Sequence, residues 1–365
     1  MWKGTIVMKI IHCSDLHLDS KLEANLDKEK AKQRRDEILY SFQNMVNFAN
    51  NNDVRIIIIA GDLFDKNKVS VKAKNIVRDT ILANKNIDFI YLKGNHDEEN
   101  FIIDEIPDNL KLFNKNEWNS YKYENVVISG IEFGKKDSYE IYKSLMLNQS
   151  DFNIVVLHGQ ESNYENKKDK TEIINLRELK NKNIDYLALG HIHKYKLEKL
   201  DNRGIYCYSG CLEGRGFDEC GEKGFVLLNI ENNKLETKFI SNSIRTLEEL
   251  EVDVSDTMTT TEVEQKINEK IEKIPKQNLI KIILVGKVDI NSERDIDYLL
   301  KKYNEEFYYV KIYDKTTLKI NYLDYENDAS LKGEFIRMIL KENLTEEEKK
   351  EIIITGLKAL AGEEL

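Results

Sequence analysis

The sequence predicts a mixed α/β fold, built as one mixed sheet or as two stacked sheets with helices on the outside. Short apolar runs alternate with segments whose apolar residues recur every three or four positions, as strands followed by helices do. Only two of the 365 residues are proline, which favours continuous strands and helices over proline-rich linkers. Hydrophobic residues make up 41% of the chain, enough to fill the cores of one large domain and one smaller domain.

The first two thirds of the chain supply the elements of the large domain. A buried strand is expected at 8–13, and a helix follows over roughly 28–50. The β-branched run at 55–60 is apolar on both faces, which suits the middle of a sheet that is covered on both sides. A second helix at 71–83 and a third strand at 89–92 continue the alternation. Later strands are expected at 126–130, 153–157, 186–189, 205–208 and 224–230.

A smaller unit is expected after a change in composition near residues 240–245. Strands and helices should alternate there in a βαβαβ order of about 80 residues, long enough for a small domain of its own. The expected elements are a strand at 247–254, a helix at 261–274, a strand at 279–288, a helix at 293–307 and a strand at 309–312.

Two amphipathic helices are expected in the tail of the chain. The first should bury Leu331, Phe335, Ile339 and Leu340. The second opens on a capping box, in which Thr345 and the acidic residue three positions later satisfy free main-chain amides. We therefore expect three parts, with boundaries at 8–242, 243–325 and 326–365.

Charge, cysteines and the N-terminus restrict the class of protein. The formal net charge of −10 counts against a protein that binds DNA by its own charge alone, although bound cations or a basic partner can compensate. The four cysteines form no CxxC pair, so reduced thiols are expected. The start is too short and too weakly apolar for a signal peptide, and no run approaches the roughly 18 apolar residues of a membrane helix. These features predict a cytoplasmic protein.

Five predicted strands are followed by Asp, Asn or His, which are the side chains of a metal site. Ligands gather outside the carboxyl ends of strands in open α/β sheets, and residues two apart in extended chain point to the same side. Five of the six histidines fall in these motifs, whereas His12 lies inside a strand and is interpreted as structural. The candidate residues are Asp15, His17, Asp62, Asp65, Asn95, His96, His158, His191 and His193.

The donor set of these motifs is oxygen plus imidazole without thiolate. It excludes a zinc finger and suits two divalent cations, with Mn²⁺ the expected metal and Zn²⁺ or Fe as alternatives. A carboxylate such as Asp62 can bridge two such ions. The sequence therefore predicts a two-metal hydrolytic site.

The motifs DxH, GDxxD, GNHD, HG and GHxH, in this order over roughly residues 8–240, resemble the calcineurin-like metallophosphoesterase family. The resemblance implies a β-sandwich flanked by helices and two metal ions that share Asp62. One ion would be held by Asp15, His17, Asp62 and His193. The other would be held by Asp62, Asn95, His158 and His191.

The resemblance also implies catalytic roles for two further side chains. The residue matching His96 contacts the substrate phosphate and helps the leaving oxygen to depart. The residue matching Asp65 orients that histidine, although some members have His at this position.

Three features resemble the SbcD and YhaO branch of DNA-repair exonucleases. They are the opening KIIHCSDLHL, the stretch YSGCLEGRGFDE with the following GEKGF, and the βαβαβ unit, which resembles that branch's capping domain over the active site. The protein Ser/Thr phosphatases carry Arg-Gly after GDxxD, whereas Lys66 and Asn67 stand here. This resemblance implies a Mn²⁺-dependent DNA exonuclease subunit of DNA repair, with endonuclease activity left open. An SbcC-like coiled-coil ATPase would bind the tail.

Several alternatives stay open from the sequence. The same site could serve a phosphodiesterase of small nucleotides, or metals could shape a binding module that has no activity. The tail helices could instead pack on their own domain, and the chain could form a homodimer. Arg215 could contact a phosphate or make a surface ion pair, and Tyr164 and Tyr195 could stack on bases or pack. We expect the polar segment 162–183 to be ordered near the site.

Overall fold

The computed structural model forms two compact units, residues 1–248 and 249–365, which are considered separately below. The expected boundaries at 242 and 325 stay predictions. Tyr164 and half of the polar segment 162–183 (residues 162–172) lie outside the described part of the chain, as do Lys66 and Asn67. The structure describes residues 7–20, 22, 26–65, 69–97, 106–132, 138–161, 173–289, 292–319, 325 and 328–361.

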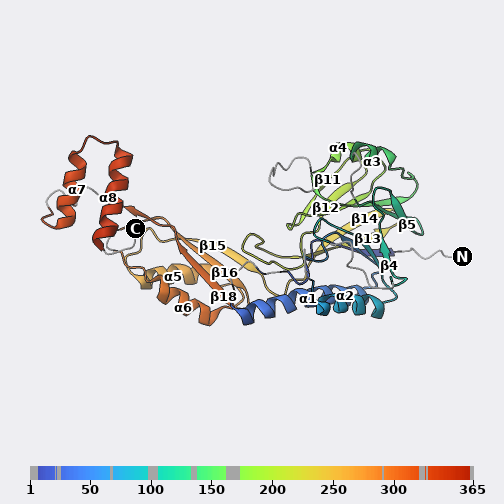
Figure 1. Ribbon diagram of the computed structural model, residues 1–365, viewed down its shortest axis with the longest axis horizontal. Coiled ribbons are helices and arrows are strands. Elements are labelled where there is room, and N and C mark those ends of the chain that lie inside the picture. The colour runs from blue at the N-terminus through green and yellow to red at the C-terminus, as the bar shows by residue number, and fades with distance from the viewer. Residues whose placement is uncertain are drawn as a thin grey trace. The chain divides into compact units, whose positions relative to one another are not determined.

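The first unit is built around two six-stranded sheets (Figure 1). In the first sheet, β1, β2, β3 and β4 run parallel to one another, while β13 lies antiparallel against β1 and β14 antiparallel against β13. Its strands, in spatial order, are β14 (Lys234–Ser241), β13 (Gly224–Glu231), β1 (Val7–Cys13), β2 (Ile56–Ala60), β3 (Asp88–Leu92) and β4 (Leu110–Leu112).

The second sheet also mixes both pairings. Strands β6, β7, β10 and β12 run parallel, and the outer strands β5 and β11 are antiparallel to their neighbours. Its strands, in spatial order, are β11 (Lys196–Lys199), β12 (Ile205–Tyr208), β10 (Tyr186–Gly190), β7 (Phe152–His158), β6 (Val126–Gly130) and β5 (Asn119–Tyr123). Beyond β7, a short parallel pair forms between β8 (Gln160–Glu161) and β9 (Ile173–Ile174).

The layers follow from the alternation of side chains along the strands. In β2, Ile57 and Ile59 pack with residues of α1 (Lys28–Asn51) and α2 (Val71–Ala83). Ile56 and Ile58 instead belong to the cluster that joins the two sheets. This explains why every residue of β2 is buried, as its apolar run predicts.

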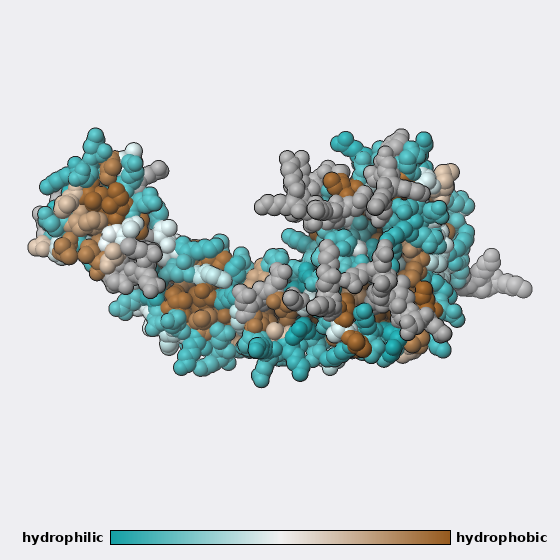
Figure 2. Space-filling model, viewed as in Figure 1, coloured by the Kyte–Doolittle hydropathy of each residue, from teal (hydrophilic) through white to brown (hydrophobic). Residues whose placement is uncertain are grey.

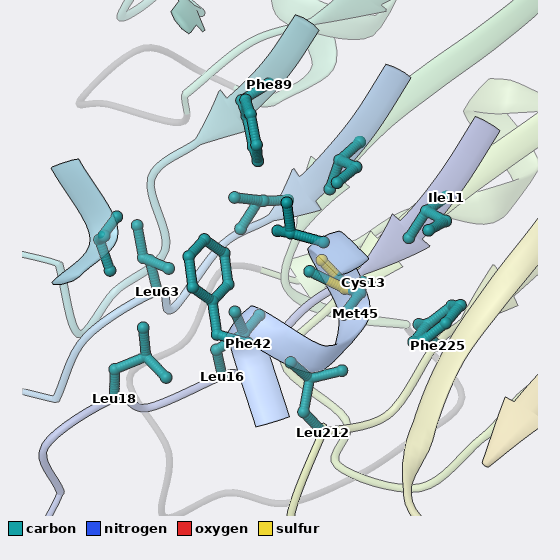
Figure 3. Packing of buried hydrophobic residues seen from close by; sticks show 14 of the residues in the cluster. Ile11, Cys13, Leu16, Leu18, Phe42, Met45, Leu63, Phe89, Leu212 and Phe225 are labelled. Atoms are coloured by element: carbon teal, nitrogen blue, oxygen red, sulfur yellow. The ribbon is translucent and has the colours of Figure 1, made fainter. Parts of the chain in front are cut away.

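Helices cover the outer faces of both sheets, which confirms the stacked-sheet form of the predicted fold. Figure 3 shows Phe42 and Met45 of α1 among Ile11, Phe89 and Phe225 of the first sheet. The short helices α3 (Ser138–Ser144) and α4 (Leu176–Leu179) contribute to the cluster on the outer face of the second sheet.

The second unit has the predicted βαβαβ order, with the three-stranded sheet β15-β16-β18 as its core. The strand expected at 279–288 is two strands, because Gly286 adopts a φ of 114° and turns the chain. After this turn, β17 (Lys287–Asp289) pairs with β19 (Thr317–Lys319). The main elements are β15 (Leu247–Asp253), α5 (Thr260–Ile271), β16 (Leu279–Val285), α6 (Ile296–Glu306) and β18 (Tyr309–Asp314).

The tail forms the two predicted helices, α7 (Leu331–Lys341) and α8 (Glu346–Ala361). Their shared core includes Ile336 and Ile353, and apolar residues gather over these helices on the face seen in Figure 2. The expectation that Leu331 is buried was wrong: it is 71% exposed, and Ile336 occupies the buried stripe instead. None of the described helices is long and apolar enough to cross a membrane.

The predicted capping box at the start of α8 is confirmed. The main-chain amide of Thr345 donates to Glu348 at 2.9 Å, and the amide of Glu348 donates to the Thr345 hydroxyl at 3.3 Å. Two of the free amides at this helix start are therefore satisfied by side chains.

Candidate metal centre

The turns after five strands meet at one place in the first unit. Strands β1, β2 and β3 are parallel neighbours in one sheet, and β7 and β10 are parallel neighbours in the other, so their carboxyl ends lie at common edges. The two edges face each other, because Asp62 after β2 lies 3.4 Å from His158 at the end of β7. All ten site residues predicted from sequence lie in the described part of the chain.

The main chain at this place is held in an unusual conformation. Asp15, His17, Asp62 and His191 all have positive φ, between 42° and 100°, a region that side chains with a Cβ rarely adopt. Hydrogen bonds fix the first two turns to each other: the amide of Asp15 donates to Gly61 O and the amide of His17 to Asp62 O, each at 3.0 Å. Such clusters of backbone strain are typical of functional sites.

Gly61 and Gly190 make room for His158. A Cβ on Gly61 would lie 2.0 Å from the Nδ1 atom of His158, and φ at Gly61 is +94°. A Cβ on Gly190 would lie 1.8 Å from the carbonyl oxygen of Ala60. Only glycine at these positions lets the imidazole of the second sheet approach the first.

One group of donor atoms forms around His158. Its Nδ1–H donates to the carbonyl oxygen of Ala60 at 2.9 Å. In the neutral ring, the Nε2 lone pair therefore faces two other acceptors, Asn95 Oδ1 at 3.0 Å and Asp62 Oδ2 at 3.4 Å. Three acceptors that converge in this way need a positive charge between them, which fits a metal cation.

The pKa shifts of His158 and Asp62 also show that this group stabilises a positive charge. Burial alone would lower the pKa of His158, but the hydrogen bond and charge of Asp62 outweigh it and raise the pKa to about 9. Burial opposes ionisation of Asp62, but His158 and His17 lower the pKa of this carboxyl below its ordinary value. A divalent cation can replace the proton on His158 and stabilise the carboxylate in the same way.

A second group forms around His17 and His193, whose Nε2 atoms lie 3.1 Å apart. The Nδ1–H of His193 donates to Glu219 at 2.6 Å, which leaves its Nε2 free of a proton in the neutral ring. Asp15 Oδ1 lies 3.8 Å from His193 Nε2, and Asp62 Oδ2 lies 3.7 Å from His17 Nε2. Donor atoms of Asp15, His17 and His193 all lie within 4.8 Å of one another.

Asp15 and His191 are joined through the main chain. The Ser14 hydroxyl donates to Asp15 at 2.5 Å, and the amide of His191 donates to both carboxylate oxygens of Asp15 at 2.9 Å. The imidazole of His191 lies edge-on to that of His158, with ring centroids 5.6 Å apart. Among the described residues, no group of three or more His, Cys, Asp or Glu donors within 4.8 Å includes His191.

His96 and Asp65 form a pair beside these groups. The Nδ1–H of His96 donates to Asp65 Oδ1 at 2.9 Å, and this hydrogen bond lowers the pKa of Asp65. The side chain of His96 is 32% exposed, so a substrate can reach it. Its main-chain amide donates to Asp62 at 2.8 Å, which ties the pair to the candidate ligands.

Two supporting residues were missed by the sequence reasoning. Asp97 accepts hydrogen bonds from the amides of Phe64 and Gly94, at 3.0 and 2.9 Å, and so joins two of the turns. Burial and the charge of Asp62 raise its pKa to about 6. Asp97 ends the GNHD motif and Glu219 ends YSGCLEGRGFDE, so motif membership was the available signal.

The remaining candidates are Arg215, Tyr195 and His12. Arg215 makes an ion pair with Glu219 at 2.8 Å, and Tyr195 packs on Phe239 with ring centroids 4.8 Å apart. His12 is buried and shares a hydrogen bond of 2.8 Å with Tyr186, and burial lowers its pKa to about 3, which fits the structural role expected for it.

The cysteines do not change the donor set. All four are free, as expected. Cys211 lies near His193 and Glu219, but burial raises the pKa of its thiol well above the usual value, so it stays protonated. The candidate ligands therefore remain oxygen and imidazole.

Comparison with known proteins shows the family of the chain. A family model described as calcineurin-like phosphoesterase matches residues 8–195, more than half of the chain. The chain is a calcineurin-like phosphoesterase. Members of this family use a dinuclear metal centre, and the described groups of donors are of the kind that such a centre needs. This phosphoesterase is accordingly a metal-dependent phosphodiesterase.

Curated relatives match the phosphoesterase at about one quarter identity. The metallophosphoesterase YhaO of Bacillus subtilis is 27% identical over 76% of this chain and 72% of its own length. The DNA double-strand break repair protein Mre11 of Sulfolobus acidocaldarius is 27% identical over 98% of this chain and 100% of its own. The SbcD component of the nuclease SbcCD of Staphylococcus epidermidis is 25% identical over 68% of this chain and 74% of its own.

Proposed function

We propose that this phosphoesterase is a Mn²⁺-dependent DNA exonuclease subunit that acts in DNA repair beside an SbcC-like ATPase. The observation that carries the proposal is the similarity to the Sulfolobus acidocaldarius repair protein, which extends over 98% of this chain. It includes the second unit and the tail helices, which a phosphodiesterase of small nucleotides does not need. Endonuclease activity is left open.

The proposed metal ligands are the side chains that the sequence predicts. Asp15, His17, Asp62 and His193 would hold one ion, and Asp62, Asn95, His158 and His191 the other. Asp62 fits the shared position because its Oδ2 atom lies within 3.7 Å of both His17 and His158. The carboxylate and amide oxygens suit Mn²⁺, and the absence of thiolate fits this choice. When bound, the ions would supply charge that polarises the phosphodiester and acidifies a water molecule.

His96 and Asp65 would assist departure of the leaving group. Asp65 accepts the Nδ1 proton of His96, which fixes the orientation of the ring and leaves Nε2 to face the substrate. From there, His96 would hold a phosphoryl oxygen and donate a proton to the departing sugar oxygen. The partial exposure of His96 supports this role.

Arg215 is proposed to bind a phosphate of the DNA. Its described hydrogen bonds use the main-chain amide, Nε and Nη2, and its side chain is 18% exposed. The edge of the guanidinium that carries Nη1 is thus available for a phosphate oxygen. The net charge of −10 opposes DNA binding, so a cation placed beside the candidate metal centre should matter for affinity.

Residues 243–325 are proposed as the capping domain and 326–365 as the docking segment for the coiled coil of the ATPase. A groove of ≈ 490 Å³ on the tail helices is lined by Phe335, Ile352 and Gly356, with Glu348 and Glu351 beside them. An apolar groove with acidic neighbours suits an amphipathic helix that carries basic residues.

The decisive experiment compares DNA with a small phosphodiester. The purified chain is incubated in Mn²⁺ with end-labelled duplex DNA, single-stranded DNA, closed circular DNA and bis-p-nitrophenyl phosphate, with and without an SbcC-like ATPase. We expect release of nucleotides from DNA ends that requires Mn²⁺ and increases with the ATPase.

Other outcomes identify the alternatives. Hydrolysis of bis-p-nitrophenyl phosphate and small nucleotides, with DNA left intact in every combination, would replace the nuclease by the small-molecule phosphodiesterase. Tight Mn²⁺ binding without hydrolysis of any ester would indicate the metal-shaped binding module. Light scattering of the same preparation measures whether two copies associate.

A further inference from the structure

The loop between β12 and β13, residues 209–223, encloses His193 from the side away from the candidate metal donors. We refer to it as the cradle loop. Glu219 accepts the Nδ1–H of His193, and the Lys223 ammonium donates to the carbonyl oxygen of His193 at 3.1 Å. The cradle loop therefore holds both the side chain and the main chain of this histidine.

Glu219 accepts hydrogen bonds from both His193 and Arg215. Its Oε1 atom accepts from His193 Nδ1 at 2.6 Å and from Arg215 Nη2 at 2.8 Å. Its Oε2 atom accepts the main-chain amide of Arg215 at 2.8 Å. A single buried carboxylate thus touches a candidate metal ligand and the candidate phosphate-binding arginine at the same time.

Glu219 is buried, and its hydrogen bonds place it between the imidazole of His193 and the guanidinium of Arg215. A carboxylate behind an imidazole fixes the tautomer, orients the ring and makes the far nitrogen a better ligand. The same carboxylate holds the guanidinium by charge-assisted hydrogen bonds, which fix its direction.

The anchoring of the cradle loop depends on a different residue. Glu213 accepts from the buried Arg34 at 2.9 Å and from the Ser41 hydroxyl at 2.7 Å, and both of these belong to α1. Arg34 also donates to Gly214 O at 3.0 Å. Attachment of the loop and support of His193 are therefore carried by two separate glutamates.

We infer that Glu219 is a positioning residue that aligns His193 for its metal ion and Arg215 for the substrate phosphate. The first half of this inference rests on the proposed role of His193 as a metal ligand, and the second half on the proposed role of Arg215. The phosphoesterase would thus couple occupancy of one metal position to the alignment of its substrate arginine.

Metal binding without substrate tests the first half. Mn²⁺ is titrated into wild type and Glu219→Gln, and free Mn²⁺ is measured by its electron paramagnetic resonance signal. We expect one of the two Mn²⁺ ions to bind about 10–100-fold more weakly in the variant, with the other unchanged. Glu213→Gln is the matched control, because it alters the same loop without touching His193. It should lower the midpoint of unfolding and leave both Mn²⁺ affinities unchanged.

Two results would overturn the first half. One is unchanged Mn²⁺ binding in a folded Glu219→Gln protein. The other is an equal loss of affinity in both variants, which would mean that Glu219 merely stabilises the loop. Neither result depends on which ester is cut, so failure of the proposed nuclease function is distinguishable from failure of this inference.

A double-mutant comparison tests the second half. At saturating Mn²⁺, KM and kcat for DNA cleavage are measured for Glu219→Gln, Arg215→Ala and the combined variant. We expect each single change to raise KM. The combined change should raise KM no further than the larger single effect, because each single change already breaks the same Glu219–Arg215 pair. Effects that multiply in the combined variant would show that Glu219 and Arg215 act independently.

Discussion

His158 donates its Nδ1 proton to the carbonyl oxygen of Ala60 at 2.9 Å, so an imidazole from the second sheet is held by the main chain of the first. This hydrogen bond orients His158 Nε2 toward Asp62 and Asn95. The site therefore exists only when the two sheets are packed in their native register.

Gly61→Ala should damage the site and the stability together. The new Cβ would lie 2.0 Å from His158 Nδ1 at a position with positive φ, so the ring must move. We expect a loss of about 1–3 kcal/mol in the free energy of unfolding from strain alone, with weaker Mn²⁺ binding in addition. Urea unfolding and Mn²⁺ titration measure the two effects.

Gly221→Ala is the control for this substitution. Gly221 also has a positive φ, of 85°, but nothing lies within 4 Å of the Cβ position. It should cost roughly 1 kcal/mol for the backbone conformation and leave Mn²⁺ affinity intact. Equal Mn²⁺ affinities in the two variants would contradict the role of Gly61 in making room for His158.

His96→Ala should keep metal binding and lose catalysis. His96 touches Asp62 only through its main-chain amide, which the substitution retains. We expect kcat to fall by about 10²–10⁴-fold, the usual contribution of a positioned acid, with both Mn²⁺ affinities within error of wild type. Single-turnover cleavage and Mn²⁺ titration provide the two measurements. Retained activity would remove His96 from its assigned role.

Removal of metal should abolish activity and lower thermal stability. Without cations, the buried carboxylates of Asp15 and Asp62 lose the charges that would stabilise them. Addition of Mn²⁺ at about 100 times its dissociation constant should raise the free energy of unfolding by about 2.7 kcal/mol per site. Calorimetry in EDTA and after restoration with Mn²⁺ checks this. Full activity in EDTA, or a transition temperature unaffected by Mn²⁺, would contradict the proposed centre.

His12 should make the fold sensitive to acid. Burial lowers the pKa of His12 from 6.5 to about 3. As the pH falls below 6.5, His12 is therefore protonated in the unfolded chain but stays neutral in the folded protein. Above pH 6.5, His12 therefore does not change the free energy of unfolding with pH. Below pH 6.5, His12 lowers the free energy of unfolding by about 1.4 kcal/mol for each pH unit, down to about pH 3.

His12→Asn isolates this effect, because asparagine cannot take up the proton. Urea unfolding in EDTA at about pH 7.5 and about pH 5.5 should show that wild type loses about 1.4 kcal/mol more than the variant between the two conditions. An identical pH dependence in the two proteins would mean that the folded state accommodates the charged ring.

The core elements could be predicted from sequence because their signals are local. Helix α2 and strands β6 and β12 begin and end where the apolar pattern predicts. Strands β5, β11 and β14 were missed because each lies at a sheet edge and carries many polar, partly exposed side chains. Such strands lack the apolar run that marks a strand covered on both faces.

The sequence by itself determined which donor types the candidate metal centre offers. Each turn that carries a candidate ligand is a short motif in which a strand ends and Asp, Asn or His follows, so the type and order of these donors are local properties. The tertiary structure alone decided which donors meet. Glu219 lies 26 residues from His193 and accepts its hydrogen bond only because the cradle loop after β12 packs against the turn that follows β10. Contacts between distant segments depend on how the sheets and loops pack, and no local pattern records that packing.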